Sequence, residues 1–384
     1  MASPMLGACL LRFAVSLHWQ LRAEHKHENI LSSPFSISTT LLMTVFGAGG
    51  NTAKQLFGAL HLKECGDDKI DENFSSFLNG VSSYGPNVSF HMANGMYVDR
   101  EIKVRNQYRL LLNTFYKANI ESVDFRKNPE AARGEANAWV FKQTASKIKN
   151  LLPSGSVNNA TVFMLVNALY FKGVWESPFK ASYSKPGNFS VSLKKDVEVT
   201  MMRQEGKFKF AYVDDLSSIA VELPYKGGKC SMIIFLPYEL EGLEFVEKKL
   251  SEPLLLSAFA QLSLGDVRLT LPKFKLDLRE NLKHTLEGLG VKDLFTPKTA
   301  DLSGIFETGK PWVSEIFHEA FLQVDEDGTE AAAATAEVGY NSAPPEPGLL
   351  TEIEVDHPFL FVIKDNDQDL LLFMGSFVEP ANKK

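Results

Sequence analysis

The sequence predicts an α+β protein, and two different hydrophobic patterns support this prediction. Near the N-terminus, Leu10, Phe13 and Leu17 recur at helical spacing, so we expect an amphipathic helix over residues 5–24. Residues 161–173 instead form a nearly continuous apolar run, which is the pattern of a central strand buried on both faces. The 28 phenylalanines also suit a core that is rich in β-sheet.

Further elements are predicted in chain order from turn signals and periodicity. A second helix begins at Pro34, where Ser33 or Ser36 can cap it, and it ends at the glycine-rich stretch 47–50. The partly alternating stretch 88–98 predicts a strand. The remaining expected elements are a helix over 129–152, a hairpin over 222–237, a strand over 271–275, a helix over 282–289, and core strands at 357–361 and 372–375.

Composition and charge limit what the chain can be. With 384 residues, of which 45% are hydrophobic, it can bury a core in one large domain or in two ordinary ones. A net charge of −7 argues against a general affinity for nucleic acids or acidic membranes. No apolar run approaches the length that spans a bilayer. We therefore expect neither a nucleic-acid partner nor a membrane partner.

The sequence also argues against an enzyme. A nucleophile elbow of the form Gly-x-Ser-x-Gly is absent, and His318-Glu319 lacks the second histidine of a His-Glu-x-x-His metal motif. The three cysteines, Cys9, Cys65 and Cys230, do not have the paired spacing of a zinc or redox site, and their odd number leaves at least one free thiol. We expect no catalytic residues, no metal and no cofactor.

A stretch near the C-terminus has an unusual composition. Residues 331–336 are all small, whereas residues 339–348 contain two glycines and three prolines and cannot lie inside a regular element. An exposed segment of this length between two strand-like runs is usually functional or disordered. Composition alone fits either a flexible linker or a loop that must sometimes enter a sheet.

This stretch resembles the reactive-centre loop of the serpin family. The residues that carry the likeness form the hinge of inhibitory serpins: Glu326, Asp327, Gly328, Thr329, Glu330, Ala331, Ala332, Ala333, Ala334 and Thr335. Asp327 departs from the family pattern, in which a second glutamate is common, but it keeps the charge. The resemblance covers essentially the whole chain and implies a single domain of residues 1–384. It also implies the serpin fold, with three β-sheets, eight to nine helices and an exposed reactive-centre loop at about residues 326–352.

Other residues match named serpin regions. Ser33, Ser36, Asn167 and His318 correspond to the shutter, a buried polar cluster at which strands of the main sheet separate. We call these four residues the shutter cluster. Trp175 corresponds to the breach, where the loop first enters that sheet. Because buried polar groups must be hydrogen-bonded, a cluster that re-pairs with an incoming strand can have two stable arrangements.

The resemblance implies a suicide-substrate inhibitor of serine or cysteine proteases. A target protease would attack the loop, form a covalent acyl complex, and be trapped when the loop inserts as a strand. The inhibitor is expected to be a monomer. The alternative is a non-inhibitory serpin that acts as a carrier, chaperone or prohormone. Such members tend to carry bulky or charged residues or proline where this chain has alanines.

Three positions compete for the acyl side of the cleaved bond. The usual family spacing from the hinge glycine selects Ser342-Ala343, which suits elastase-like pockets. Tyr340 offers an anchor for chymotrypsin-like enzymes. Residues 342–346 resemble the segment that follows the cleaved bond in another serpin. This resemblance would place Asn341 of the present chain on the acyl side. Residues 329–355 contain no Lys or Arg, so trypsin-like proteases are poor candidates.

Secretion is the expected location, with a cytoplasmic serpin as the alternative. Four Asn-x-Ser/Thr triplets, at Asn73, Asn87, Asn159 and Asn188, are glycosylation candidates, although each is weak by itself. The N-terminus does not have the form of a signal peptide, because a charged residue interrupts its apolar run. Residues 66–82 are acidic where heparin-binding serpins are usually basic, so no heparin site is expected there.

Overall fold

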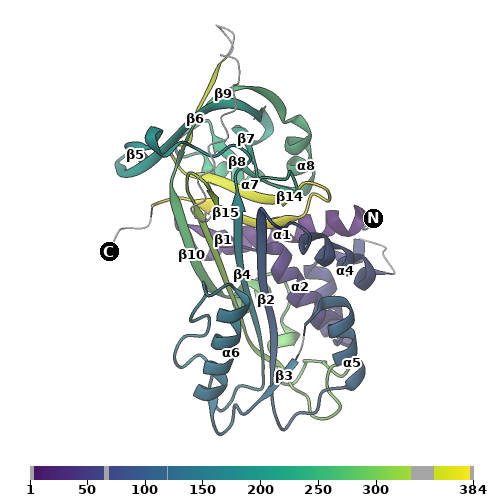
Figure 1. Cartoon of the computed structure of the whole chain (residues 1–384). Coiled ribbons are helices and arrows are strands. Elements are labelled where there is room, and N and C mark those ends of the chain that lie inside the picture. The colour runs from purple at the N-terminus through teal and green to yellow at the C-terminus, as the bar shows by residue number, and fades with distance from the viewer. Residues whose placement is uncertain (1–3, 65–68, 119, 330–349, 381–384) are drawn as a thin grey trace.

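The computed structural model describes residues 4–64, 69–118, 120–329 and 350–380, in which long strands run along most of the molecule beside a group of helices (Figure 1). The nine α-helices of these ranges are α1 (Pro4–Glu24), α2 (Pro34–Val45), α3 (Gly50–Ala59), α4 (Ile70–Val81), α5 (Asn106–Leu111), α6 (Pro129–Gln143), α7 (Leu243–Lys249), α8 (Glu252–Gln261) and α9 (Lys283–Gly288). None of the described helices is both long enough and apolar enough to cross a bilayer.

Six strands form the sheet at the centre of the molecule (Figure 1). Their order is β10 (Phe274–Asn281), β11 (Val313–Val324), β12 (Gly328–Thr329), β4 (Phe163–Val174), β2 (Val88–Asp99) and β3 (Ile120–Val123). β10 is antiparallel to β11 and β2 is antiparallel to β4, but β11 and β4 lie parallel to each other. The apolar run 161–173 forms most of β4, whose side chains are almost all buried, as expected for a central strand.

The other strands form one nine-stranded hydrogen-bonded system. Their order is β1 (Ile30–Ser32), β15 (Leu371–Phe377), β14 (Phe359–Asp365), β8 (Cys230–Pro237), β7 (Ser218–Pro224), β6 (Lys195–Val213), β9 (Ser263–Pro272) and β13 (Thr351–Glu354), with β5 (Lys185–Ser192) paired to β6. Residues 209–213 of β6 pair with β7, whereas its residues 201–210 pair with β9. The three expected sheets are therefore the six-stranded sheet and two sheets that share β6.

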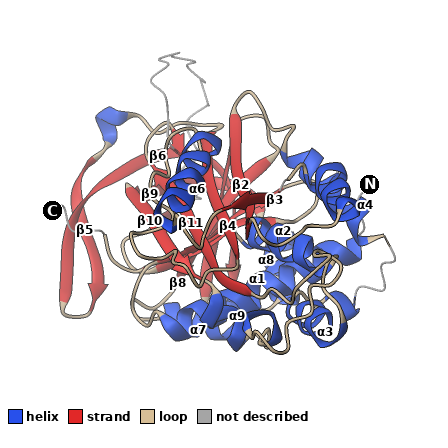
Figure 2. Cartoon of the chain, turned by 90° about the horizontal axis from the view of Figure 1, so that it is seen from below, coloured by secondary structure: helices blue, strands red, loops and turns tan. Residues whose placement is uncertain are grey.

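Helix α2 lies buried behind the six-stranded sheet, and its sequence explains where it starts. The hydroxyl oxygen of Ser33 accepts a hydrogen bond from the backbone N–H of Ser36 (3.1 Å), and Pro34 occupies the first turn. Every residue of α2 is buried. Figure 2 shows α6 on the other side of the sheet from α1, α2 and α9. The strands between α2 and α6 are thus covered on both faces.

Helix α6 is shorter than predicted. The helix expected over 129–152 ends at Gln143, because Ala145 and Ser146 have positive φ angles of 49° and 65°. Residues in this left-handed conformation end a helix. Residues 144–152, which we call the return segment, then pack their apolar side chains into the same hydrophobic cluster as α6.

Candidate functional site

The candidate site is the seam between β11 and β4, the two central strands of the six-stranded sheet. They pair directly over residues 313–321 of β11 and 163–170 of β4. Beyond these ranges β12 lies between them, with Thr329 opposite Val324 on one side and Gly173 on the other. The residues just before position 330 thus already form the start of an additional strand in the seam.

Thr329 is completely buried at the entrance of the seam. Its hydroxyl group shares a hydrogen bond with the phenol of Tyr225 (2.6 Å). The ring of Tyr225 stacks on Trp175, with 4.5 Å between the ring centroids and 14° between the planes. Burial raises the pKa of Tyr225 well above its usual value, so the phenol stays neutral. These contacts form a closed site for the first side chain that enters the sheet.

Gly328 occupies a position that only glycine fits. Its φ angle is +155°, a conformation that other residues rarely adopt. A β-carbon at this position would also lie 2.0 Å from the carbonyl oxygen of Gly173. The close approach of β12 to β4 therefore requires the glycine of the predicted hinge.

Trp175 fixes the turn that leads into β12. Its backbone N–H donates to the carbonyl of Asp327 (2.9 Å), and its indole N–H donates to the carbonyl of Asp325 (3.0 Å). The backbone N–H of Phe179 donates to the carbonyl of Glu326 (2.8 Å). The tryptophan expected where the loop enters the sheet lies directly against this turn.

Glu326 anchors the same turn through its side chain. The carboxylate forms an ion pair with Lys273, which lies between β9 and β10, and accepts a hydrogen bond from the hydroxyl of Ser184 (2.7 Å). Partial burial alone would raise the pKa of Glu326, but the hydrogen bonds from Lys273 and Ser184 outweigh it and hold the pKa below its usual value. Reasoning from sequence missed both partners and also Tyr225, because no local pattern links these residues to the hinge.

The shutter cluster brings β11, β4 and α2 into contact. His318 and Asn167 lie opposite each other across the seam, and Nδ1 of the imidazole donates to the side-chain oxygen of Asn167. The other ring nitrogen, Nε2, accepts a hydrogen bond from the backbone N–H of Ser33 (3.2 Å). The amide nitrogen of Asn167 also donates to the hydroxyl of Ser36 (2.7 Å). Burial lowers the pKa of His318 to about 3, so its ring is neutral, consistent with one donating and one accepting nitrogen.

Two further residues extend this network. The side-chain oxygen of Asn94, on β2, accepts from the hydroxyl of Ser36 (3.2 Å) and from the amide of Asn167, and the hydroxyl of Thr40 lies 3.0 Å from the same amide. The side-chain nitrogen of Asn94 is buried without a partner among the described residues. An unpaired buried N–H is costly, so the network is incompletely satisfied in this arrangement.

Part of the predicted site lies outside the described residues. It comprises Glu330, Ala331, Ala332, Ala333, Ala334 and Thr335 of the hinge and the cleavage candidates Tyr340, Asn341, Ser342 and Ala343. The roles assigned to these residues stay predictions.

The four glycosylation candidates differ in accessibility. Asn159 is exposed in a turn before β4, and Asn188 is exposed on β5. Asn73, within α4, and Asn87, just before β2, are half-buried. Asn159 and Asn188 are therefore the more accessible of the four candidates.

The cysteines and acidic side chains do not form a reactive or metal-binding centre in the part of the chain described above. Cys9, on α1, is disulfide-bonded. Cys230, on β8, is a buried free thiol, and burial raises its pKa to about 12, which makes it unreactive at neutral pH. Within the described ranges, no group of three or more His, Cys, Asp or Glu side chains is placed to hold a metal ion.

Comparisons with known proteins agree with this geometry. The model of the family described as serpin (serine protease inhibitor) matches residues 9–380. The chain is 45% identical to Iris of Ixodes ricinus over 373 residues, which are 96% of this chain and 98% of Iris. It is 38% identical to leukocyte elastase inhibitor A of Mus musculus over 375 residues, which are 96% of this chain and 97% of that protein. The crystal structure of uncleaved ovalbumin matches with a TM-score of 0.89 at 29% identity and covers 98% of this chain and 100% of that one. The predicted α+β serpin fold is thereby confirmed, and the chain belongs to the serpin family of serine protease inhibitors and is not an enzyme.

Proposed function

We propose that this serpin is a suicide-substrate inhibitor that traps a protease by inserting its cleaved loop into the seam. The nucleophile of a serine or cysteine protease would attack the carbonyl carbon of the acyl-side residue. The peptide bond would break and an ester or thioester would form, while the protease's general acid protonates the leaving amine. The hinge, now free at one end, would continue β12 through the seam and carry the protease with it.

The observation that carries this proposal is the strand polarity at the seam. β11 and β4 are parallel to each other, whereas β12 is antiparallel to both. A continued β12 would therefore replace one parallel ladder with two antiparallel ladders, and antiparallel pairing is slightly more stable per residue. The gain in backbone hydrogen bonds supplies a driving force for insertion once the loop has been cut.

The register of β12 indicates how the hinge would fit. Continuing the pairing of Thr329 along the seam would bring Thr335 between His318 and Asn167. Because successive side chains of a strand alternate between faces, Ala333 would point into the core on the same side as Thr329. The core-facing positions of the inserted hinge would then carry only methyl and hydroxyl groups, which suit a tightly packed sheet.

Insertion would rearrange the shutter cluster. The hydrogen bond between His318 and Asn167 spans the seam and must open before a strand can pass. The incoming backbone and the hydroxyl of Thr335 would offer both side chains new partners. The side-chain nitrogen of Asn94 has no partner among the described residues, so the rearrangement could also supply a partner for this group.

The same register supports the predicted cleavage region. It would bring Tyr340 beside Val313, at the far end of the seam, so cleavage at or just beyond this point would release a strand of the required length. We rank Ser342 first as the acyl-side residue, Tyr340 second and Asn341 third. Elastase-like and chymotrypsin-like proteases are accordingly the proposed targets, and relatives of this chain carry the name leukocyte elastase inhibitor.

The test is incubation of the protein with neutrophil elastase, chymotrypsin and trypsin, followed by electrophoresis in SDS and mass spectrometry. We expect SDS-resistant complexes with the first two proteases and a released C-terminal peptide that begins at Ala343. The cleaved chain that escapes complex formation should melt at a much higher temperature than the intact chain, because the added strand completes the sheet. Cleavage that gives neither a complex nor added stability would identify a non-inhibitory carrier, chaperone or prohormone, and trapping of trypsin alone would overturn the proposed specificity.

We also propose that the protein is secreted and glycosylated. The disulfide of Cys9 and the exposed Asn159 and Asn188 suit an oxidising, extracellular setting. Expression in a secreting eukaryotic cell, with and without N-glycosidase treatment, tests the proposal. A chain that stays in the cytoplasm without glycans would favour the cytoplasmic alternative.

A further inference from the structure

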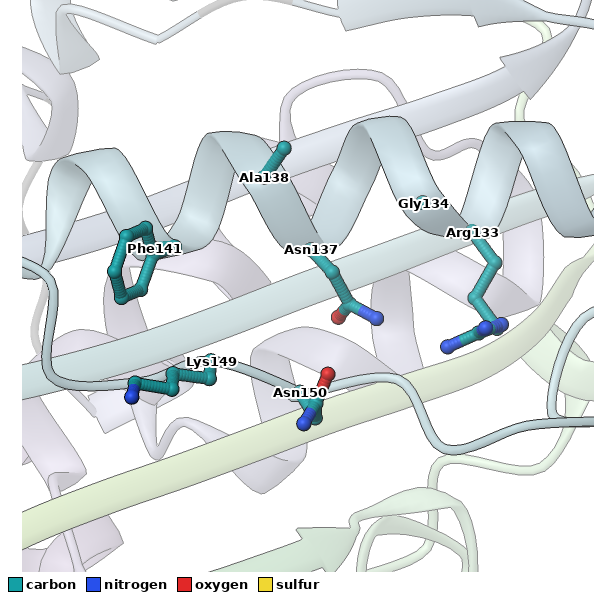
Figure 3. A pocket seen from close by; sticks show the side chains of 7 residues that line it. All are labelled: Arg133, Gly134, Asn137, Ala138, Phe141, Lys149 and Asn150. Atoms are coloured by element: carbon teal, nitrogen blue, oxygen red, sulfur yellow. The ribbon is translucent and has the colours of Figure 1, made fainter.

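A groove on the α6 side of the six-stranded sheet takes no part in the mechanism proposed above. Figure 3 shows it between α6 and the return segment, residues 144–152. Its volume is about 500 Å³, and it is lined by Arg133, Gly134, Asn137, Ala138, Phe141, Lys149 and Asn150. The groove lies over the seam region, because α6 and the return segment pack in one hydrophobic cluster with side chains of β4 and β11.

The base of the groove is held together by polar contacts. The side-chain oxygen of Asn137 accepts from the backbone N–H of Leu152 (2.8 Å), and its amide nitrogen donates to the carbonyl of Leu152 (2.9 Å). Both residues are buried. Gly134 and Ala138 leave the helix side open because their side chains are small, and the half-buried ring of Phe141 supplies an apolar wall.

Two cationic side chains stand at opposite ends of the groove (Figure 3). Arg133 is 22% exposed, donates to the carbonyl of Leu152 (2.9 Å) and pairs with Glu130 (2.8 Å). Lys149 is exposed and has neither an ion pair nor a hydrogen bond within the described residues. None of the residues that line the groove is acidic. The groove therefore carries a cationic side chain at each end, with the charge of Arg133 partly offset by Glu130, and has the ring of Phe141 as an apolar wall between them.

We propose that this groove binds an elongated dianion with an apolar middle, such as a linear dicarboxylate. Arg133 is anchored at Leu152, three residues along the return segment from Lys149. At about 3.3 Å per residue of non-helical chain, this spacing separates the two cations by roughly 10 Å. One anionic group of the ligand would pair with each cation, and the side-chain amide of Asn150 could donate a hydrogen bond to the anionic group beside Lys149. The apolar middle of the ligand would lie on the ring of Phe141.

Occupancy of the groove would impede loop insertion, a consequence that rests on the function proposed above. The cluster around α6 includes Val166 of β4 and Phe317 of β11, which lie on the two sides of the seam. An entering strand would separate β4 from β11 by one further strand spacing, about 4.8 Å, so the packing of α6 and the return segment across the seam must shift. A ligand that ties α6 to the return segment would oppose this shift and leave more time for the acyl-enzyme to hydrolyse.

Calorimetric titration of the intact protein with nonanedioate, and separately with the monoanion nonanoate, tests the binding site. We expect nonanedioate to bind about fivefold more tightly, because only the dianion pairs with both cations. Lys149→Ala removes an exposed side chain, so the fold should persist and the preference for the dianion should be lost. Lys142→Ala is the matched control, because Lys142 is exposed on α6 but does not line the groove. Equal affinity for the two compounds, or a preference that survives Lys149→Ala, would overturn the proposal.

The effect of ligand binding on loop insertion is tested separately, by measuring the stoichiometry of inhibition. With the groove saturated, more inhibitor should be consumed per trapped protease in the wild type and in Lys142→Ala, but not in Lys149→Ala. An unchanged stoichiometry under saturation would refute the coupling alone. If the protein traps no protease at all, the titration still decides whether the groove binds the dianion, so the two proposals fail independently.

Discussion

His318 on β11 and Asn167 on β4 hydrogen-bond to each other across the seam, and this bond closes the path that an inserting strand would follow. Both side chains are completely buried. If the strands parted with nothing between them, each side chain would lose a partner in a place that water does not reach. The pair therefore favours the closed sheet until a strand can supply replacement partners.

A charge at position 333 should abolish trapping, whereas the same charge at position 332 should be tolerated. In the proposed register Ala333 would enter the core between Leu169 and Ala320, where an unpaired carboxylate would cost several kcal/mol. Ala332 would point to the opposite face, beside a ring that the ammonium group of Lys275 covers.

The matched variants Ala333→Glu and Ala332→Glu separate these positions. Stoichiometry of inhibition and SDS-resistant complex formation should show Ala333→Glu behaving as a substrate and Ala332→Glu staying close to the wild type. In the proposed mechanism these side chains enter the sheet only after cleavage, so we expect both proteins to unfold like the wild type before cleavage. Identical behaviour of the two variants would contradict the register.

Acidification should destabilise the folded protein in part through His318. Its pKa falls from the ordinary value of 6.5 to about 3 in the folded chain, because burial disfavours the charged ring. Between these two values the unfolded chain binds a proton that the folded chain does not, so stability is lost as the pH falls through this window. The histidine can contribute at most about 1.4 kcal/mol per pH unit to the free energy of unfolding.

Urea unfolding of the wild type and of His318→Gln at pH values from 7 to 4 measures this contribution. The glutamine variant should start less stable at neutral pH and should lose less stability on acidification. Parallel pH profiles for the two proteins would show that His318 does not titrate as described. The contribution of the acidic groups to the pH dependence of stability cancels in this comparison, because both proteins contain the same acidic groups.

The ion pair between Glu326 and Lys273 should stabilise the turn that leads into β12. Replacing Glu326 by Gln removes the charge but keeps a hydrogen-bonding group, and we expect a loss of about 1 kcal/mol, since Lys273 is partly exposed and solvent screens the pair. Glu326→Lys should cost more, because it places two ammonium groups together beside Ser184.

A double-mutant cycle with Glu326→Lys and Lys273→Glu checks that the effect belongs to the pair. The reversed pair should recover part of the stability that Glu326→Lys loses, as measured by the urea midpoint. Additive losses in the double variant would mean that the two residues act independently of each other.

Loss of the hydrogen bond between Thr329 and Tyr225 should lower the free energy of unfolding only when one of the two buried polar groups stays in place without its partner. Tyr225→Phe leaves the buried hydroxyl of Thr329 unpaired and should cost about 1–3 kcal/mol. Thr329→Val has nearly the same shape and should cost a similar amount by leaving the phenol unpaired. The double variant removes both polar groups, so its free energy of unfolding should return toward that of the wild type; a double variant as unstable as the sum of the two would rule out this account.

The sequence by itself determined those features that depend on short stretches of chain. The capping signal around Ser33 and Pro34 marked the start of α2, and the uninterrupted apolar run 161–173 marked β4 as a central strand. Gly328 was recognisable within the hinge, and the structure adds the reason, which is the close approach of its backbone to Gly173. The end of α6 was predicted less well, because Ile148 and Leu151 continue the apolar content past the true end of the helix.

Only the tertiary structure decided which distant side chains meet. Tyr225, Lys273 and Asn94 lie far apart in the sequence, and strand order and register alone bring the first two to the hinge and the third to the shutter cluster. A shift of one residue in any of these strands would turn its side chains to the opposite face. The parallel polarity of β11 and β4 is likewise a property of chain crossings rather than of either strand's residues. This polarity leaves the seam able to take one more strand. No local pattern in the sequence encodes it, because pairing between strands is a long-range interaction.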